Sequence, residues 1–248
     1  MLDVGGIRLL SDPLLGRHAG LLRRRGPGPR AADWHGARAI LLSHLHHDHA
    51  ELSSLRKLPG VPIMTAPANA GWIQRHGLSA PATDSDPWWR VGDVVVRLVD
   101  AEHRSRPMPH RPNAANGHLV IAGDVRVWVA GDTSLYPGLE ELPDLAGGGI
   151  DLAVVPIAGW GPRLSAGHLG PVEAAEACRR VQARYALPVH WGTLRPPGAH
   201  LLPTGWMDRP AREFVAALAE RAPECRARVL TPGERRDFGA DDSVGPAL

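Results

Sequence analysis

The segment Ser43–His49 (SHLHHDH) places four imidazoles and one carboxylate in six consecutive positions, directly after the apolar run Ala39–Leu42. A short buried strand ending in such a cluster would deliver its side chains to one edge of a sheet. Imidazole binds zinc, iron and manganese, and an added carboxylate favours a hydrolytic ion. The pattern therefore predicts a catalytic metal site with His44, His46 and His49 as ligands. The alternative is a surface histidine tract that binds metal loosely.

Three further residues follow apolar runs elsewhere in the chain, and each could reach the same sheet edge. They are His103 after the run 94–99, Asp132 after 125–129, and His190 after 187–189. Gly131 would permit the tight turn before Asp132. Taken singly, each would be a hydrogen-bonded core or rim residue. Together with the first cluster they complete a ligand set.

The order of expected elements points to an α/β fold with two sheets covered by helices. At 248 residues the chain could form one large domain or two small ones, and the absence of a linker or repeat favours a single domain over residues 1–248. We expect strands at 7–10, 39–42, 61–65, 94–99, 118–122, 125–129, 152–155, 188–190 and 226–230, and helices at 48–58, 67–76, 171–185 and 210–221.

The motif His44-Leu-His-His-Asp-His49, followed by a later His, a Gly-Asp-Thr aspartate and a final His, resembles the metallo-β-lactamase superfamily. The segments 8–13 (RLLSDP), 168–174 (HLGPVEA) and 189–193 (VHWGT) resemble one branch within it. That branch holds the L-ascorbate-6-phosphate lactonases and N-acyl-phosphatidylethanolamine phospholipase D. The resemblance implies a four-layer αββα sandwich with two metal ions between the sheet edges.

The resemblance also implies a role for each matching residue. His44, His46 and His103 would hold the first ion, Asp48, His49 and His190 the second, and Asp132 would bridge the two. Zinc is the expected metal, with manganese or iron as alternatives. Asp48 and Asp132 would also act in catalysis, two ions at close range activating a hydroxide nucleophile.

Substrate and supporting residues are less strongly indicated. His168 would bind substrate or protonate the leaving group, its alternative being a helix-capping region. Asp12 would hydrogen-bond a metal-binding histidine. Arg106 and Arg111, in the irregular loop after His103, could grip a phosphate, although arginine on a surface is most often only solvated. The small, polar segment 113–118 (NAANGH) argues against a lipid substrate.

The leading functional hypothesis is a binuclear metal-dependent hydrolase in which metal-bound hydroxide attacks a phosphoester or a lactone-like ester of a small anionic molecule. A nuclease of the same superfamily and a non-catalytic metal-binding regulator are the alternatives. Nucleic acid is not the expected partner, because a nuclease would need a basic surface near the site and usually an added module, and the segment Arg17–Arg30 is the only feature in its favour. The sequence leaves open whether chains form a homo-oligomer.

The sequence bears on the cellular compartment only through features that are not seen in it. Cys178 and Cys225 lie far apart and form no thiolate or disulfide pattern. No signal peptide and no membrane-spanning run is visible in the sequence. We therefore expect a cytoplasmic protein.

Overall fold

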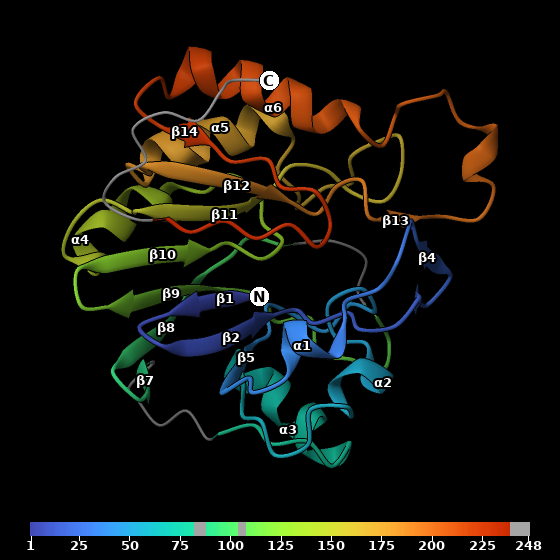
Figure 1. The fold of residues 1–248 in the computed structure, drawn as a ribbon, viewed down its shortest axis with the longest axis vertical. Helices are drawn as coiled ribbons and strands as arrows, with labels where there is room; N and C mark the ends of the chain where they lie inside the picture. The colour runs from blue at the N-terminus through green and yellow to red at the C-terminus, as the bar shows by residue number, and fades with distance from the viewer. Residues whose placement is uncertain (82–87, 104–107, 239–248) are drawn as a thin grey trace.

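The computed structural model describes residues 1–81, 88–103 and 108–238, and in them the strands form two facing sheets and one small separate sheet (Figure 1). The first sheet has the order β1-β2-β5-β6, with β1 (Leu2–Val4), β2 (Ile7–Ser11), β5 (Ala39–Leu41) and β6 (Ile63–Met64). The second has the order β14-β12-β11-β10-β9-β8-β7, with β14 (Arg226–Ala227), β12 (Tyr185–Val189), β11 (Leu152–Pro156), β10 (Val125–Val129), β9 (Asn116–Ala122), β8 (Val94–Asp100) and β7 (Trp88–Val91). The small sheet joins β13 (Leu194–Arg195), β4 (Leu22–Arg24) and β3 (His18–Ala19).

Helices cover the outer faces of the two large sheets. Figure 1 shows α3 (Pro67–Arg75) below the first sheet, with α1 (Ala31–Trp34) and α2 (Leu52–Leu55) to the side of it. The second sheet is covered by α4 (Leu142–Ala146), α5 (Pro171–Arg180) and α6 (Arg209–Arg221), together with the 3-10 turn Pro137–Glu141; a second such turn spans Ala199–Leu201. The fold is therefore the four-layer αββα sandwich that the sequence predicts.

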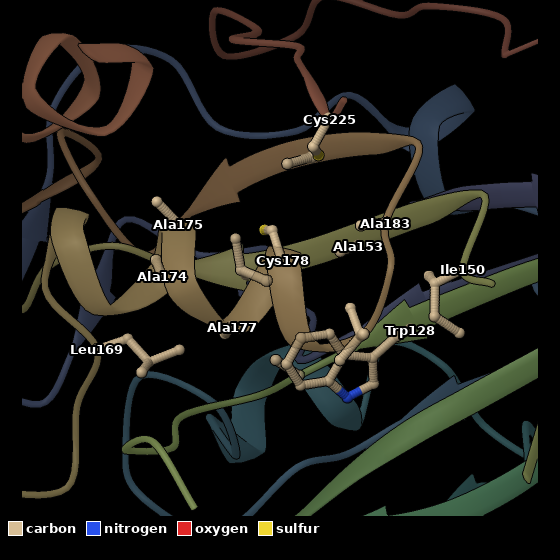
Figure 2. Packing of buried hydrophobic residues seen from close by; sticks show 14 of the residues in the cluster. Trp128, Ile150, Ala153, Leu169, Ala174, Ala175, Ala177, Cys178, Ala183 and Cys225 are labelled. Atoms are coloured by element: carbon tan, nitrogen blue, oxygen red, sulfur yellow. The ribbon is translucent and has the colours of Figure 1, made fainter. Parts of the chain in front are cut away.

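Alternation along the strands creates the layers, because successive side chains of a strand point to opposite faces. In β10, Val127 and Val129 pack between the two sheets, whereas Trp128 packs under the helices. Figure 2 shows Trp128 close to Cys178 of α5 in this outer cluster. In β5, Leu41 faces the other sheet and Ile40 faces the layer of α3. Strands buried on both faces must be apolar throughout, which explains the runs seen in the sequence.

Two expected helices are shorter than the sequence pattern suggests. The helix expected at 48–58 is only α2, because Glu51 caps it by accepting hydrogen bonds from the backbone N–H groups of Ser53 (3.0 Å) and Ser54 (2.7 Å). The helix expected at 171–185 ends at Arg180, because Gln182 adopts a left-handed φ of 51°. Residues 185–189 then pair in parallel with β11 as strand β12.

Candidate metal centre

The first group of potential ligands comes from the loop after β5 and from the segment that follows β8. His44, His46 and His103 each offer one ring nitrogen, and these nitrogens lie within 4.8 Å of one another. His46 Nδ1 lies 3.2 Å from His103 Nε2. The ring of His44 lies 4.5 Å, centre to centre, from each of the other two rings. Segments separated by the whole β6–β8 region therefore meet at one sheet edge.

The second group joins Asp48 and His49 with Asp132, which follows β10, and His190, which follows β12. His49 Nε2 and His190 Nε2 lie 3.1 and 3.3 Å from Asp132 Oδ2. The same two nitrogens each lie 3.3 Å from Asp48 Oδ2. Two carboxylates thus face two imidazoles, and all four side chains are largely buried.

Asp132 lies between the two groups. Its Oδ2 is 4.0 Å from His44 Nε2 of the first group and also 3.3 Å from His168 Nε2. His103, Asp132 and His168 form a third overlapping set of potential ligands. The structure therefore brings together all seven residues that the sequence indicated as ligands, with Asp132 at their centre.

Hydrogen bonds on the outer side of three imidazoles fix how the rings point. His103 Nδ1 donates to Gly167 O and His190 Nδ1 donates to Ala158 O, each over 2.8 Å. His49 Nδ1 lies 2.8 Å from Asp12 Oδ2. Since a carbonyl or carboxylate oxygen accepts the Nδ1 proton, Nε2 of each ring is directed toward the cluster.

Asp12 and Ser43 form the support under this arrangement. The Oδ1 atom of Asp12 accepts from Ser43 N over 2.8 Å, and Oδ2 accepts from the Ser43 hydroxyl over 2.7 Å. Ser43 Oγ also lies 2.9 Å from His44 Nδ1. Asp12 adopts a left-handed φ of 40°, and His190 one of 61°, which is costly for non-glycine residues and recurs at functional sites.

The donor set fits divalent cations. Among the described residues, His44 Nε2 and Asp132 Oδ1 are buried and have no hydrogen-bond partner, which is expensive unless a ligand satisfies them. His49 Nε2 and His190 Nε2 lie 3.3 Å apart. Two nitrogens that share a tetrahedral zinc at about 2.0–2.1 Å would be separated by roughly 3.3 Å. These contacts are those of ligands around an ion.

The electrostatics of the pocket agree with this fit. Burial lowers the pKa of His44 well below its usual value and that of His103 to about 4, so both rings stay neutral, as ligands must. Burial alone would also lower the pKa of His49, but Asp132 and Asp48 raise it well above the usual value, so a cation bound here would displace the proton of that ring. Burial opposes ionisation of Asp132, yet the neighbouring imidazoles of His190 and His49 hold its pKa well below its usual range. The carboxylates thus carry negative charge that a cation would balance.

Trp160 belongs to the site but has no signal in the sequence. Its Nε1 donates to Asp48 Oδ2 over 2.5 Å, and its ring packs 4.3 Å from that of His190. It stands in an irregular loop after β11, without periodicity or a metal-binding side chain. Only the fold brings it to Asp48, 112 positions earlier in the chain.

Of the three predicted substrate residues, His168 lies at the metal centre and Arg111 lies against the histidine loop. His168 lies in the site, with Nδ1 3.0 Å from Ser165 Oγ and its ring against His103. The guanidinium of Arg111 instead donates to Leu45 O (2.6 Å) and Ala50 O (3.1 Å). Arg111 also lies over the ring of Trp72, so its guanidinium contacts the histidine loop and α3, and its phosphate-binding role stays a prediction. Arg106 lies outside the described residues.

The fold and the histidine-rich site define a metallohydrolase of the metallo-β-lactamase type. The family model described as Beta-lactamase superfamily domain matches residues 7–191, and the chain belongs to this family. The superfamily predicted from the motif is thereby confirmed. The chain is a metal-dependent hydrolase of the β-lactamase superfamily.

Relatives and solved structures agree with this assignment. A metal-dependent hydrolase of Thermococcus onnurineus is 29% identical over 234 residues, which cover 93% of this chain and 92% of the relative. The N-acyl-phosphatidylethanolamine-hydrolyzing phospholipase D 1 of Caenorhabditis elegans is 23% identical over 217 residues; the match covers 78% of this chain and 61% of that longer protein. The solved isothiocyanate hydrolase from Delia radicum gut bacteria has a TM-score of 0.69 at 16% identity, covering 96% of this chain and 95% of that one, which shows the fold alone.

Proposed function

We propose that the protein uses two divalent metal ions, zinc in the first place and manganese or iron as alternatives, to hydrolyse a phosphoester or a lactone-like ester. One observation carries the proposal. The group His44, His46 and His103 and the group Asp48, His49 and His190 both approach Asp132, which can therefore contact an ion in each group. Elements from both sheets contribute ligands, which supports treating residues 1–248 as one hydrolase domain.

Divalent cations held in this way supply Lewis-acid polarisation of the scissile bond and activation of water. The residues of the chain have separate tasks. Asp48 and Asp132 provide the negative charge that retains the cations, and Trp160 fixes the orientation of the Asp48 carboxylate. His168 places its Nε2 at the site, beside Asp132, where a proton carried by this nitrogen can be donated to the leaving oxygen of the substrate.

The expected substrate is a small anionic ester. The Caenorhabditis elegans relative is named for a phosphodiester lipid, which favours phosphoester chemistry here. The small residues of the segment 113–116 give little apolar surface for an acyl chain. Among the described residues, no helix has the length and apolarity needed to cross a bilayer.

The test is a substrate panel run on protein loaded with zinc or manganese, together with metal analysis. We expect close to two ions per chain and turnover of bis(p-nitrophenyl) phosphate or a sugar-phosphate lactone. Asp132→Ala should reduce turnover to background, whereas Asp124→Ala, an exposed aspartate in the β9–β10 turn, should leave it unchanged. One ion per chain, or undiminished turnover by Asp132→Ala, would contradict the binuclear proposal.

His168 has its own readout. His168→Ala should slow esters with poor alkoxide leaving groups far more than p-nitrophenyl esters, because the latter leave without protonation. An equal loss on both kinds of ester would contradict the proton-donating role and indicate substrate binding or structural support instead.

A further inference from the structure

A second concave site lies beside the small sheet β3–β4–β13, which Figure 1 shows at one side of the sandwich. The pocket has a volume of about 440 Å³ and includes Gly26–Gly28 in its wall. Its chemistry is set by five guanidinium groups, those of Arg17, Arg23, Arg24, Arg25 and Arg195. No metal ligand lines it.

Most of this positive charge has no carboxylate to balance it. Arg25 forms a two-pronged ion pair with Asp208, at 2.6 and 3.1 Å. Arg24 is half-buried and donates to the carbonyl oxygens of Gly16 and Leu14, so it is held in place without losing its charge. In the part of the chain that the structure describes, Arg17, Arg23 and Arg195 form no ion pair.

The strand register adds an electrostatic cost between two of these arginines. Arg23 of β4 and Arg195 of β13 are directly opposite each other across an antiparallel pair. Like charges in that position destabilise a sheet. A bound anion would remove this repulsion, because it would attract both side chains to one centre.

We propose that this arginine pocket is a binding site for a compact phosphate group carried by a small molecule. Guanidinium groups match the oxygens of phosphate in forked, charge-assisted hydrogen bonds. The volume lies in the range of small-molecule pockets, and the concave shape suits a compact group better than an extended strand of nucleic acid.

Trp160 connects the arginine pocket to the metal centre. It packs against the cluster of Leu14, Ala19 and Leu194, of which Ala19 lies in β3 and Leu194 in β13 of the small sheet, and it donates to Asp48. A Cβ atom added at Gly20, between β3 and β4, would lie 3.7 Å from the ring of His47, so the small sheet passes close to the histidine loop. The phosphate could therefore belong either to a distant part of the ester substrate, which rests on the proposed function, or to a separate effector.

The test measures binding of inorganic phosphate by calorimetry, against chloride at equal ionic strength. It uses the metal-loaded wild type and Asp132→Ala, because the pocket should bind phosphate whether or not the metal centre functions. We expect the double variant Arg23→Ala/Arg195→Ala to weaken phosphate binding at least tenfold in both backgrounds. The matched control is Arg221→Ala, an exposed arginine at the end of α6, which should bind like the parent.

Thermal unfolding without phosphate separates binding from folding. The double variant should unfold no earlier than the wild type, because it removes a repulsive pair. Binding that is absent in the wild type, unchanged in the double variant, or lost equally in Arg221→Ala would overturn the proposal. An oligonucleotide bound far more tightly than phosphate through the same arginines would also overturn it, in favour of nucleic acid.

Kinetics then distinguish the two sources of the phosphate. If it belongs to the substrate, the double variant raises KM for phosphorylated esters and leaves uncharged esters unchanged, and phosphate inhibits competitively. If it belongs to an effector, phosphate changes the turnover of uncharged esters in the wild type and not in the double variant. Each result supports the site and assigns its occupant.

Discussion

Replacement of Gly131 by alanine tests how closely the two sheets must approach at the metal centre. Gly131 precedes Asp132 and has a φ of 64°, a left-handed conformation. A Cβ atom at this position would lie 2.5 Å from the Cβ of Ser43, which sits on the facing sheet edge and supports His44 and His49. A Cβ atom cannot move without its backbone, so this contact cannot be relieved by rotating a side chain.

The expected loss follows from two separate costs. A left-handed φ costs an alanine about 1–2 kcal/mol. Forcing an atom into a packed position costs about 1–3 kcal/mol more. The sum, about 2–5 kcal/mol, corresponds to a fall in Tm of roughly 4–20 °C for a chain of this size.

Gly123 provides a control for the conformational part alone. It lies in the β9–β10 turn with a φ of 58°, and a Cβ there would meet nothing within 4 Å. Gly123→Ala should therefore lose only about 1–2 kcal/mol. Thermal and denaturant unfolding, measured with a chelator present, give the loss of unfolding free energy in each variant without a contribution from bound metal. Equal losses in the two variants would refute the close-approach argument, as would an unaltered zinc affinity of Gly131→Ala.

Four other outcomes follow from the site. Asp12→Ala should weaken zinc binding about 10–100-fold in a chelator competition, because His49 loses its oriented partner; unchanged affinity would contradict the supporting role. Trp160→Phe keeps a ring over His190 but removes the N–H donor to Asp48, so the same competition should show weaker binding with little change in unfolding free energy. Arg111→Ala should lower that free energy by about 1–3 kcal/mol through lost hydrogen bonds while KM for an anionic ester stays constant; a raised KM would support the substrate role. Addition of zinc to chelator-treated protein should raise Tm with concentration, since an ion that binds only the folded state stabilises it, and a concentration-independent Tm would count against the site.

The layers of this fold are predictable from the sequence where burial on both faces of a strand demands continuous apolar runs. β5 and β11 lie within about one residue of their expected positions for this reason. Helix ends are less predictable. The pattern of alanine and arginine after Pro171 continues to Tyr185, yet pairing with β11 outcompetes helix propensity at the last residues. Tertiary pairing of that kind is not visible in local sequence.

The same contrast holds at the candidate site. His103, Asp132 and His190 could be selected because chemistry-bearing residues at strand ends converge on one sheet edge. Trp160 could not, because an indole in an irregular loop has many other uses and its contact with Asp48 depends on the path of that loop. The contacts of Arg111 could not be predicted either, since the ring and carbonyl groups around its guanidinium come from distant segments.

Backbone strain and hydrogen bonding together indicate what holds the ligands in place. His190 and Asp12 both adopt left-handed conformations, which cost non-glycine residues about 1–3 kcal/mol each. Such conformations persist only where the surroundings determine them, here through the carbonyl of Ala158 for His190 and the amide of Ser43 for Asp12. These partners belong to the protein alone and do not depend on an ion. The ligand geometry is therefore a property of the folded chain. The free-energy cost of ordering the ligands is part of folding, and it does not have to be met again when a metal ion binds.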